Sequence, residues 1–144
     1  MAMAKATILI VEDSPDIAES LADAFRFEDF RVLLAPNAVQ ALQVTSEHRP
    51  DLILMDIQLP DMDGLAVADT LKSDPAVHHI PIIAMTAYDV GGDQARAMTK
   101  TCVGYAQKPI RPREIINLVT AVLKLPTNPE PTRRRPAPRK APGR

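Results

Sequence analysis

Short apolar segments alternate with longer amphipathic stretches over the first 125 residues of the chain. Each apolar segment is four or five residues long and is bounded by polar, Gly or Pro residues. This pattern is typical of strands that are buried on both faces of a parallel sheet. It predicts five strands, at residues 7–11, 32–35, 52–55, 82–85 and 103–106.

The stretches after these segments carry apolar residues at helical spacing. The first begins at Ser14 and the second at Asn37, which are residue types that cap helix N-termini well. The clearest amphipathic stripe covers residues 115–123. Five repeats of strand and helix predict an α/β fold, in which a doubly wound, five-stranded parallel sheet lies between two layers of helices.

Residues 126–144 differ in composition from the rest of the chain. They contain six of the 14 prolines and six of the 17 Lys and Arg residues, and they show no apolar periodicity. Their net charge is +5, whereas that of residues 1–125 is −6. Because proline fixes φ and removes a backbone donor, we expect one domain at residues 1–125 and a disordered basic tail at residues 126–144.

Composition argues against several classes of protein. The single cysteine, Cys102, cannot form an internal disulfide, so a disulfide-stapled secreted fold is excluded. No apolar run approaches the length of about 20 residues that a membrane helix needs. The run at residues 6–11 is shorter than the apolar core of a signal peptide. These features predict a soluble, cytoplasmic protein without membrane insertion.

Polar residues follow four of the five predicted strands. Glu12 and Asp13 follow the first strand, Asp56 the third, Thr86 the fourth and Lys108 the fifth. The carboxyl ends of parallel strands meet at one edge of the sheet, which is where open α/β folds bind ligands. We therefore expect these five side chains to lie close together.

The predicted cluster has the chemistry of a metal-dependent phosphoryl acceptor. Three neighbouring carboxylates repel one another, so they favour a bound cation, and Lys108 offsets part of their charge. Mg²⁺ suits a site with few protein ligands, all of them oxygen atoms. A carboxylate nucleophile beside a metal ion and an ammonium group favours phosphoryl transfer. The sequence contains no Walker loop and no G-x-G-x-x-G motif, so the donor must come from outside this chain.

Four stretches resemble the motifs of response-regulator receiver domains, in particular those of stand-alone, chemotaxis-regulator-like members. They are Ile8-Leu-Ile-Val-Glu-Asp13, Pro50-Asp-Leu-Ile-Leu-Met-Asp56-Ile-Gln-Leu-Pro-Asp-Met-Asp-Gly64, Ile80-Pro-Ile-Ile-Ala-Met-Thr-Ala87 and Gly104-Tyr-Ala-Gln-Lys-Pro109. The resemblance covers about residues 6–124. It implies a flavodoxin-like sheet of strand order 2-1-3-4-5 with five helices. It also implies a cis bond between Lys108 and Pro109.

The resemblance also implies a role for each acidic residue. Asp56 would accept the phosphoryl group, and Asp56 and Asp13 would ligate Mg²⁺ directly. Glu12 would act on the metal mostly through water. The main-chain carbonyl of Gln58 would be the third protein ligand.

Three further residues would act on the phosphoryl group or respond to it. Lys108 would pair with a phosphoryl oxygen, and Thr86 would donate its hydroxyl. Tyr105 matches the switch residue that turns inward as Thr86 shifts. Gln58 and Tyr88 occupy variable positions that influence the rate of dephosphorylation in this family.

The resemblance implies a signalling protein rather than an enzyme that turns over an outside substrate. A sensor histidine kinase or a histidine phosphotransfer protein would supply the phosphoryl group, and the chain would catalyse only its own phosphorylation and dephosphorylation. The output would pass to a downstream protein through the face formed by helix four, strand five and helix five. A phosphorylation-dependent homodimer is a second form of output.

Some residues receive a plainer interpretation. Asp61 and Asp63 lie in a Pro-Asp-Met-Asp-Gly turn and are predicted turn residues rather than metal ligands. The His78–His79 pair is predicted to lie in a solvated loop, and Cys102 to be a small buried residue. Alone, Asp56 would equally fit an ordinary carboxylate at a strand end.

Two departures of the sequence from the family pattern concern the region of helix four. Thr101 replaces a glycine that usually follows helix four in a left-handed conformation, so we expect a different turn before strand five. Gly91 and Gly92 lie where helix four begins and predict a soft start to that helix.

Three rival functions are also consistent with part of the sequence. A receiver-like adaptor would bind partners without phosphate, but the complete set of site residues argues against it. A flavodoxin-like cofactor protein would place a flavin phosphate against the acidic cluster, and the negative charge of the cluster would repel that phosphate. The basic tail would bind nucleic acid by counterion release, but residues 126–144 contain no aromatic residue to stack on bases.

Overall fold

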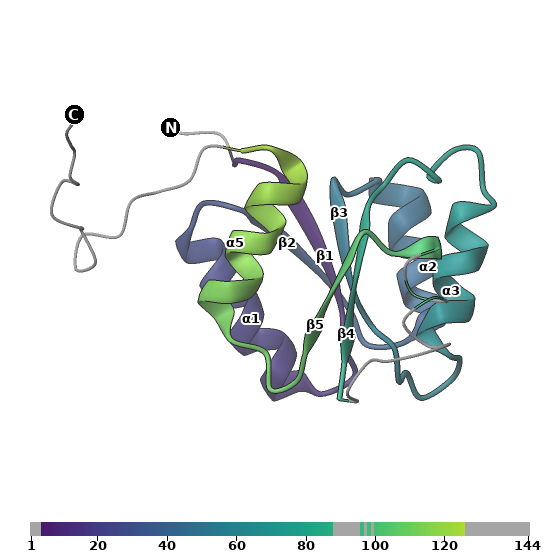
Figure 1. Ribbon diagram of the computed structural model, residues 1–144, viewed down its shortest axis with the longest axis horizontal. Helices are drawn as coiled ribbons and strands as arrows, with labels where there is room; N and C mark the ends of the chain where they lie inside the picture. The colour runs from purple at the N-terminus through teal and green to yellow at the C-terminus, as the bar shows by residue number, and fades with distance from the viewer. Residues whose placement is uncertain (1–3, 88–95, 97, 99, 126–144) are drawn as a thin grey trace, which may run out of the picture.

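A five-stranded parallel sheet forms the centre of the molecule, with helices on both of its faces (Figure 1). The computed structural model describes residues 4–87, 96, 98 and 100–125. The strands are β1 (Thr7–Val11), β2 (Arg31–Ala35), β3 (Leu52–Asp56), β4 (Ile82–Thr86) and β5 (Gly104–Gln107). Their order is β2-β1-β3-β4-β5, which confirms the order that the family resemblance implied. Each predicted strand boundary is correct to within one residue.

Four helices are continuous in the described part of the chain, where five were expected. They are α1 (Pro15–Phe27), α2 (Ala38–His48), α3 (Gly64–Lys72) and α5 (Pro112–Leu123). Residues 96, 98, 100 and 101 are helical, but the predicted start of the remaining helix, with Gly91 and Gly92, lies outside the described residues. Tyr88 and the predicted tail at residues 126–144 also lie outside them. No helix within the described ranges is long and apolar enough to cross a membrane.

The helix starts follow the caps that the sequence predicts. The Ser14 side chain accepts a hydrogen bond from the N–H of Ile17 at the start of α1. The Asn37 side chain accepts one from the N–H of Gln40 at 2.9 Å at the start of α2. Each bond satisfies a backbone donor that has no partner within its helix.

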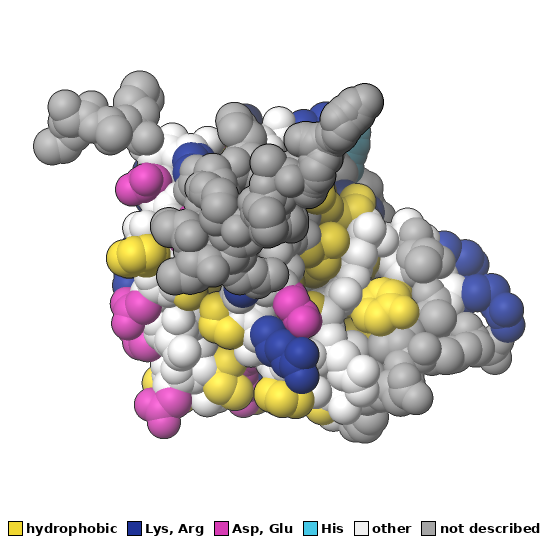
Figure 2. All heavy atoms as spheres, turned by 60° about the vertical axis from the view of Figure 1, so that its left-hand side comes forward, with side chains coloured by type: hydrophobic (Ala, Val, Ile, Leu, Met, Phe, Trp, Pro, Cys, Tyr) yellow, Lys and Arg dark blue, Asp and Glu magenta, His cyan; other side chains and the backbone are white. Residues whose placement is uncertain are grey.

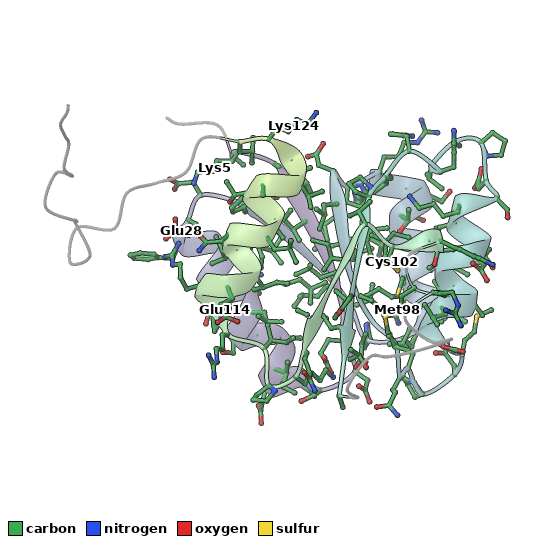
Figure 3. All side chains as sticks on the ribbon, viewed as in Figure 1. Lys5, Glu28, Met98, Cys102, Glu114 and Lys124 are labelled. Atoms are coloured by element: carbon green, nitrogen blue, oxygen red, sulfur yellow. The ribbon has the colours of Figure 1, made fainter. Side chains whose placement is uncertain are left out.

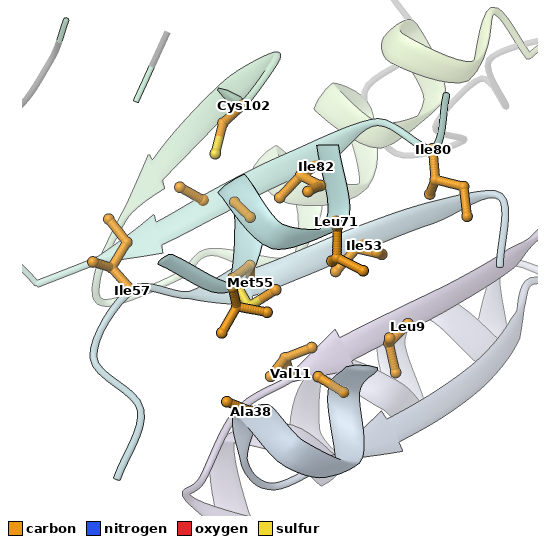
Figure 4. Close-up of a cluster of buried hydrophobic side chains, with 14 of the residues drawn as sticks. Leu9, Val11, Ala38, Ile53, Met55, Ile57, Leu71, Ile80, Ile82 and Cys102 are labelled. Carbon is orange, nitrogen blue, oxygen red and sulfur yellow. The ribbon is translucent and has the colours of Figure 1, made fainter. Parts of the chain in front are cut away.

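Successive strand residues point to opposite faces of the sheet, so the core divides into two apolar clusters. Ile8 and Ile10 of β1 belong to the cluster beneath α1 and α5, whereas Leu9 and Val11 belong to the cluster beneath α2 and α3 (Figure 4). All four of these side chains are fully buried. The burial of both faces is the physical reason for the continuous apolar segments in the sequence.

The turn before β5 avoids the conformation that a glycine would adopt. Thr101 is helical, and its φ angle is not positive. Cys102 N–H donates to the Met98 oxygen at 2.7 Å, and Val103 N–H then donates to the Ile82 oxygen at 2.8 Å. Cys102 is buried, as predicted, and lies with Met98 on the α2–α3 side of the sheet (Figure 3).

Candidate functional site

The structure brings the polar residues predicted at the strand ends to one edge of the sheet. Asp56 is the last residue of β3 and Thr86 the last residue of β4, and both are buried. Glu12 and Asp13 follow β1 directly. One carboxylate oxygen from each of Glu12, Asp13 and Asp56 lies within 4.8 Å of the others. The predicted acidic cluster therefore exists.

Lys108 joins this cluster from the end of β5. Its Nζ atom lies 2.9 Å from Asp56 Oδ2 and 3.1 Å from Glu12 Oε1. Its main-chain N–H donates to the Thr86 oxygen at 2.6 Å, and the following bond to Pro109 is cis, as the resemblance implied. Burial by itself would lower the pKa of Lys108, but the two carboxylates outweigh it and raise the pKa. The ammonium group is therefore charged at neutral pH.

Glu12 is a buried acidic residue, and its surroundings disfavour its negative charge. Its residue is only 3% exposed, and its Oε2 accepts a hydrogen bond from Ser14 N–H at 3.1 Å. Its Oε1 is buried and accepts no hydrogen bond of good geometry within the described part of the chain, although Lys108 Nζ lies nearby. Burial raises the pKa of Glu12, and the charge of Asp56 raises it further. The folded protein thus holds a carboxylate oxygen that lacks a full complement of donors.

Replacing Glu12 by glutamine is expected to stabilise the metal-free protein at pH 7 by about 1 kcal/mol. A raised carboxyl pKa means that the folded state binds more protons than the unfolded state. Ionisation of Glu12 therefore weakens the folded state as pH rises from the ordinary pKa of 4.5 through the raised value. Urea unfolding in EDTA across this pH range measures the effect. The gain should vanish below pH 4.5, and a gain that persisted there would contradict this origin.

Gln58 lies in the loop that follows Asp56, with its side chain exposed. Its main-chain N–H donates to Asp56 Oδ1 at 2.9 Å. Together with the bond from Lys108, this places a donor on each oxygen of the Asp56 carboxylate. The loop and β5 therefore fix the orientation of Asp56 from two sides.

Asp61 and Asp63 stay outside the acidic cluster, in agreement with their predicted role as turn residues. Both of them cap helices. Asp63 Oδ1 accepts from Leu65 N–H at 3.0 Å at the start of α3. Asp61 accepts from Ala38 N–H at 2.9 Å and from Val39 N–H at 3.2 Å at the start of α2. Sequence reasoning missed this second cap, because 23 residues separate Asp61 from Ala38.

The two predicted switch residues differ in burial. Thr86 is fully buried, whereas Tyr105 on β5 is 46% exposed. The Tyr105 ring lies beside a hollow that is also lined by Ile110, Glu114 and Leu118. Nearly half of the Tyr105 residue is therefore accessible to solvent in this structure.

The residues present fit a magnesium ion. Three carboxylates within 4.8 Å supply hard oxygen ligands. A cation near them would also offset the charge on the buried Oε1 of Glu12, which accepts no hydrogen bond of good geometry within the described residues. Asp13 is exposed, which leaves room for the water ligands that Mg²⁺ retains. Glu12, Asp13, Asp56 and the Gln58 carbonyl would form the protein part of such a site.

Comparison with known proteins defines the class to which this fold and site belong. Residues 8–120 match the family model described as the response regulator receiver domain. The chain is 38% identical over 117 residues to the polar-differentiation response regulator DivK of Brucella anthropi, an alignment that covers 81% of this chain and 95% of that protein. The DivK protein of Brucella ovis is 37% identical over 117 residues, with the same coverage of both chains. The chain therefore belongs to the response-regulator receiver family.

Solved structures agree with this assignment. The receiver domain of the sensor histidine kinase PA1611 from Pseudomonas aeruginosa is 29% identical, with a TM-score of 0.76, and the match covers 84% of this chain and 99% of that one. That structure holds a magnesium ion in its active-site cleft. The N-terminal domain of a response regulator receiver protein from Methanoculleus marisnigri is 28% identical, with a TM-score of 0.71 and coverage of 83% and 98%. Members of this family are signalling proteins of two-component systems.

Proposed function

We propose that the chain accepts a phosphoryl group on Asp56 in a Mg²⁺-dependent reaction and that this modification controls partner binding. The observation that carries the proposal is the clustering of Glu12, Asp13 and Asp56 around one point, with Lys108 in contact with two of them. The donor is a phosphohistidine on a sensor histidine kinase or on a phosphotransfer protein. Apart from its own phosphorylation and dephosphorylation, the chain catalyses no reaction.

In this reaction an Asp56 oxygen attacks the phosphorus atom, the phosphorus–nitrogen bond of the donor breaks, and the imidazole leaves. Gln58 N–H and Lys108 Nζ hold the carboxylate in place before the attack. Lys108 then neutralises charge on a phosphoryl oxygen, and the Thr86 hydroxyl donates to another. Asp13, Asp56, the Gln58 carbonyl and, through water, Glu12 would hold Mg²⁺, which when bound would further neutralise the phosphoryl oxygens.

The donor protein is proposed to dock beside Lys108. A hollow of about 300 Å³ lies between the first turns of α1 and the loop that leads into α5. It is lined by Asp16, Ile17, Ser20, Leu21, Lys108, Pro109, Ile110 and Pro112. In Figure 2 this side of the molecule comes forward and shows hydrophobic side chains among acidic and basic ones. A partner that filled the hollow would exclude water next to the reacting carboxylate.

Phosphorylation is proposed to act through Thr86 and Tyr105. The added charge draws Thr86 and Lys108 towards the phosphoryl group, and Tyr105 turns inward from its exposed position. The changed surface around β5 and α5 binds a downstream protein or a second phosphorylated copy of the chain. We place this exchange in the cytoplasm, which is the location that the composition of the chain predicts.

Intact-mass measurement tests the acceptor directly. Wild-type protein incubated with Mg²⁺ and acetyl phosphate is expected to gain the mass of one phosphoryl group, whereas Asp56→Asn gains none because its amide is not a nucleophile. Addition of EDTA should abolish the gain in wild type. Asp63→Asn serves as the matched control, since the Asp63 side chain caps α3 and lies outside the acidic cluster, and it should be modified like wild type.

The same measurement separates the rival functions. An adduct of equal size on Asp56→Asn would remove Asp56 as the acceptor. If neither acetyl phosphate nor a histidine kinase modified the wild type, a phosphate-independent adaptor would become the better account. Binding of nucleic acid through the basic tail would instead show as loss of binding when residues 126–144 are deleted.

A further inference from the structure

The loop between β3 and α3, residues 57–63, is tied to the candidate site at its base. Gly64 N–H, just after the loop, donates to the Ile57 oxygen at 2.7 Å and closes it. Gln58, whose carbonyl is the predicted third protein ligand for Mg²⁺, donates its N–H to Asp56. The position of this loop therefore sets where the Gln58 carbonyl lies relative to Asp56.

Further along the same loop, Asp61 bonds to the N-terminus of α2. Its two oxygens accept from the N–H groups of Ala38 and Val39, at 2.9 and 3.2 Å. Asn37 caps the same helix end locally, through the N–H of Gln40. The first three N–H groups of α2 are thus satisfied by two residues from separate segments of the chain.

This end of α2 is itself fixed against the strand that leads to the other acidic residues. Ala38 is fully buried in the same cluster as Val11, the last residue of β1 (Figure 4). Glu12 N–H, next in the chain, donates to the Ala35 oxygen at 3.0 Å. The first turn of α2 contains no acidic residue, so the Asp61 carboxylate supplies the negative charge that a helix N-terminus favours. The hydrogen bond from Ala38 holds the pKa of Asp61 below its ordinary value.

We propose that Asp61 is a positioning residue for the metal site, because it joins the loop that carries Gln58 to the corner of the fold that carries Glu12 and Asp13. Asp61 lies outside the group of three carboxylates that would contact Mg²⁺. It acts through the loop, by holding the Gln58 carbonyl at a fixed place before the metal binds. This role rests on the proposed function, since it concerns the affinity of the same site for Mg²⁺.

Replacing Asp61 by alanine is expected to weaken Mg²⁺ binding about 10-fold. This is the lower end of the loss that is typical when a residue that orients a metal ligand is removed. Isothermal titration calorimetry with MgCl₂ measures this affinity without any phosphoryl donor. Amide hydrogen exchange at Gln58 and Gly64 should become faster in the metal-free variant, because the loop has lost its link to α2. Asp61→Asn keeps a side-chain oxygen acceptor and should bind Mg²⁺ with intermediate affinity.

Asn37→Ala is the matched control. It removes a cap from the same end of α2 but leaves the bonds of Asp61 intact, so Mg²⁺ affinity should stay that of wild type although the helix is weakened. Equal losses of affinity in Asn37→Ala and Asp61→Ala would overturn the positioning role, as would wild-type affinity in Asp61→Ala. If the wild type bound no Mg²⁺, the proposed function itself would fail, and with it this role.

Discussion

Replacing Lys108 by methionine is expected to lower the free energy of unfolding of the metal-free protein by about 2 kcal/mol. The substitution keeps most of the apolar stem but leaves the carboxylates of Asp56 and Glu12 without their shared cation. The loss falls below the usual cost of breaking a buried ion pair because the Lys108 side chain is 22% exposed. Urea unfolding in EDTA at pH 7 measures it.

Two further results should accompany this loss. Mg²⁺ should restore part of the stability of Lys108→Met, because a bound cation would offset the charge of the neighbouring carboxylates. Phosphorylation by acetyl phosphate should slow by about 100-fold or more, the usual cost of losing one charge-stabilising donor. Lys100→Met, at an exposed helical position, is the control and should leave both quantities unchanged. Wild-type stability of Lys108→Met in EDTA would contradict the electrostatic role given to Lys108.

Replacing Gly64 by alanine is expected to destabilise the protein by at least about 2 kcal/mol and to impair the acceptor site. A Cβ atom at this position would overlap the main-chain oxygen of Asp56 and lie 2.7 Å from Ile57 Cα. Both neighbours are backbone atoms next to the proposed phosphoacceptor, so relief requires the end of β3 or the start of α3 to move. Thermal unfolding and the rate of phosphorylation by acetyl phosphate measure the two effects.

Gly104→Ala is the matched control for this substitution. A Cβ atom on Gly104 would lie 3.7 and 3.8 Å from the two methyl carbons of Leu118, which is ordinary van der Waals contact. The residue starts β5, and strands disfavour alanine less than glycine, so stability should change little. If Gly64→Ala proved as mild as Gly104→Ala, the close approach of Gly64 to Asp56 would not limit the site.

The salt bridge between Arg113 and Glu28 is a long-range contact that no local sequence pattern predicts. Arg113 of α5 lies 3.0 Å from Glu28, the residue that caps the end of α1, and only 10% of the Glu28 side chain is exposed. This pair joins the two helices that cover one face, and 85 residues separate its partners in sequence.

The sequence alone was sufficient to predict the strands, two helix caps and the residues at the strand ends. These features depend on local chemistry: apolar runs reflect burial of both faces of a strand, and Ser14 and Asn37 bond donors within three residues. The strand order required the family resemblance, because local pattern does not say which strands are neighbours. The roles given to Asp56, Lys108 and Thr86 in phosphoryl transfer, and to Tyr105 as a switch residue, stay predictions until phosphorylation is measured.

Only the tertiary structure decided the contacts between segments that are distant in sequence. Lys108 reaches Asp56 across 52 residues, and Asp61 reaches the start of α2 across 23. The close approach of Gly64 to Asp56 likewise arises from how α3 begins against the end of β3. Such contacts depend on strand order, register and helix placement together. The sequence therefore predicted which acidic and basic residues form the site, and tertiary packing determined which of their atoms are in contact.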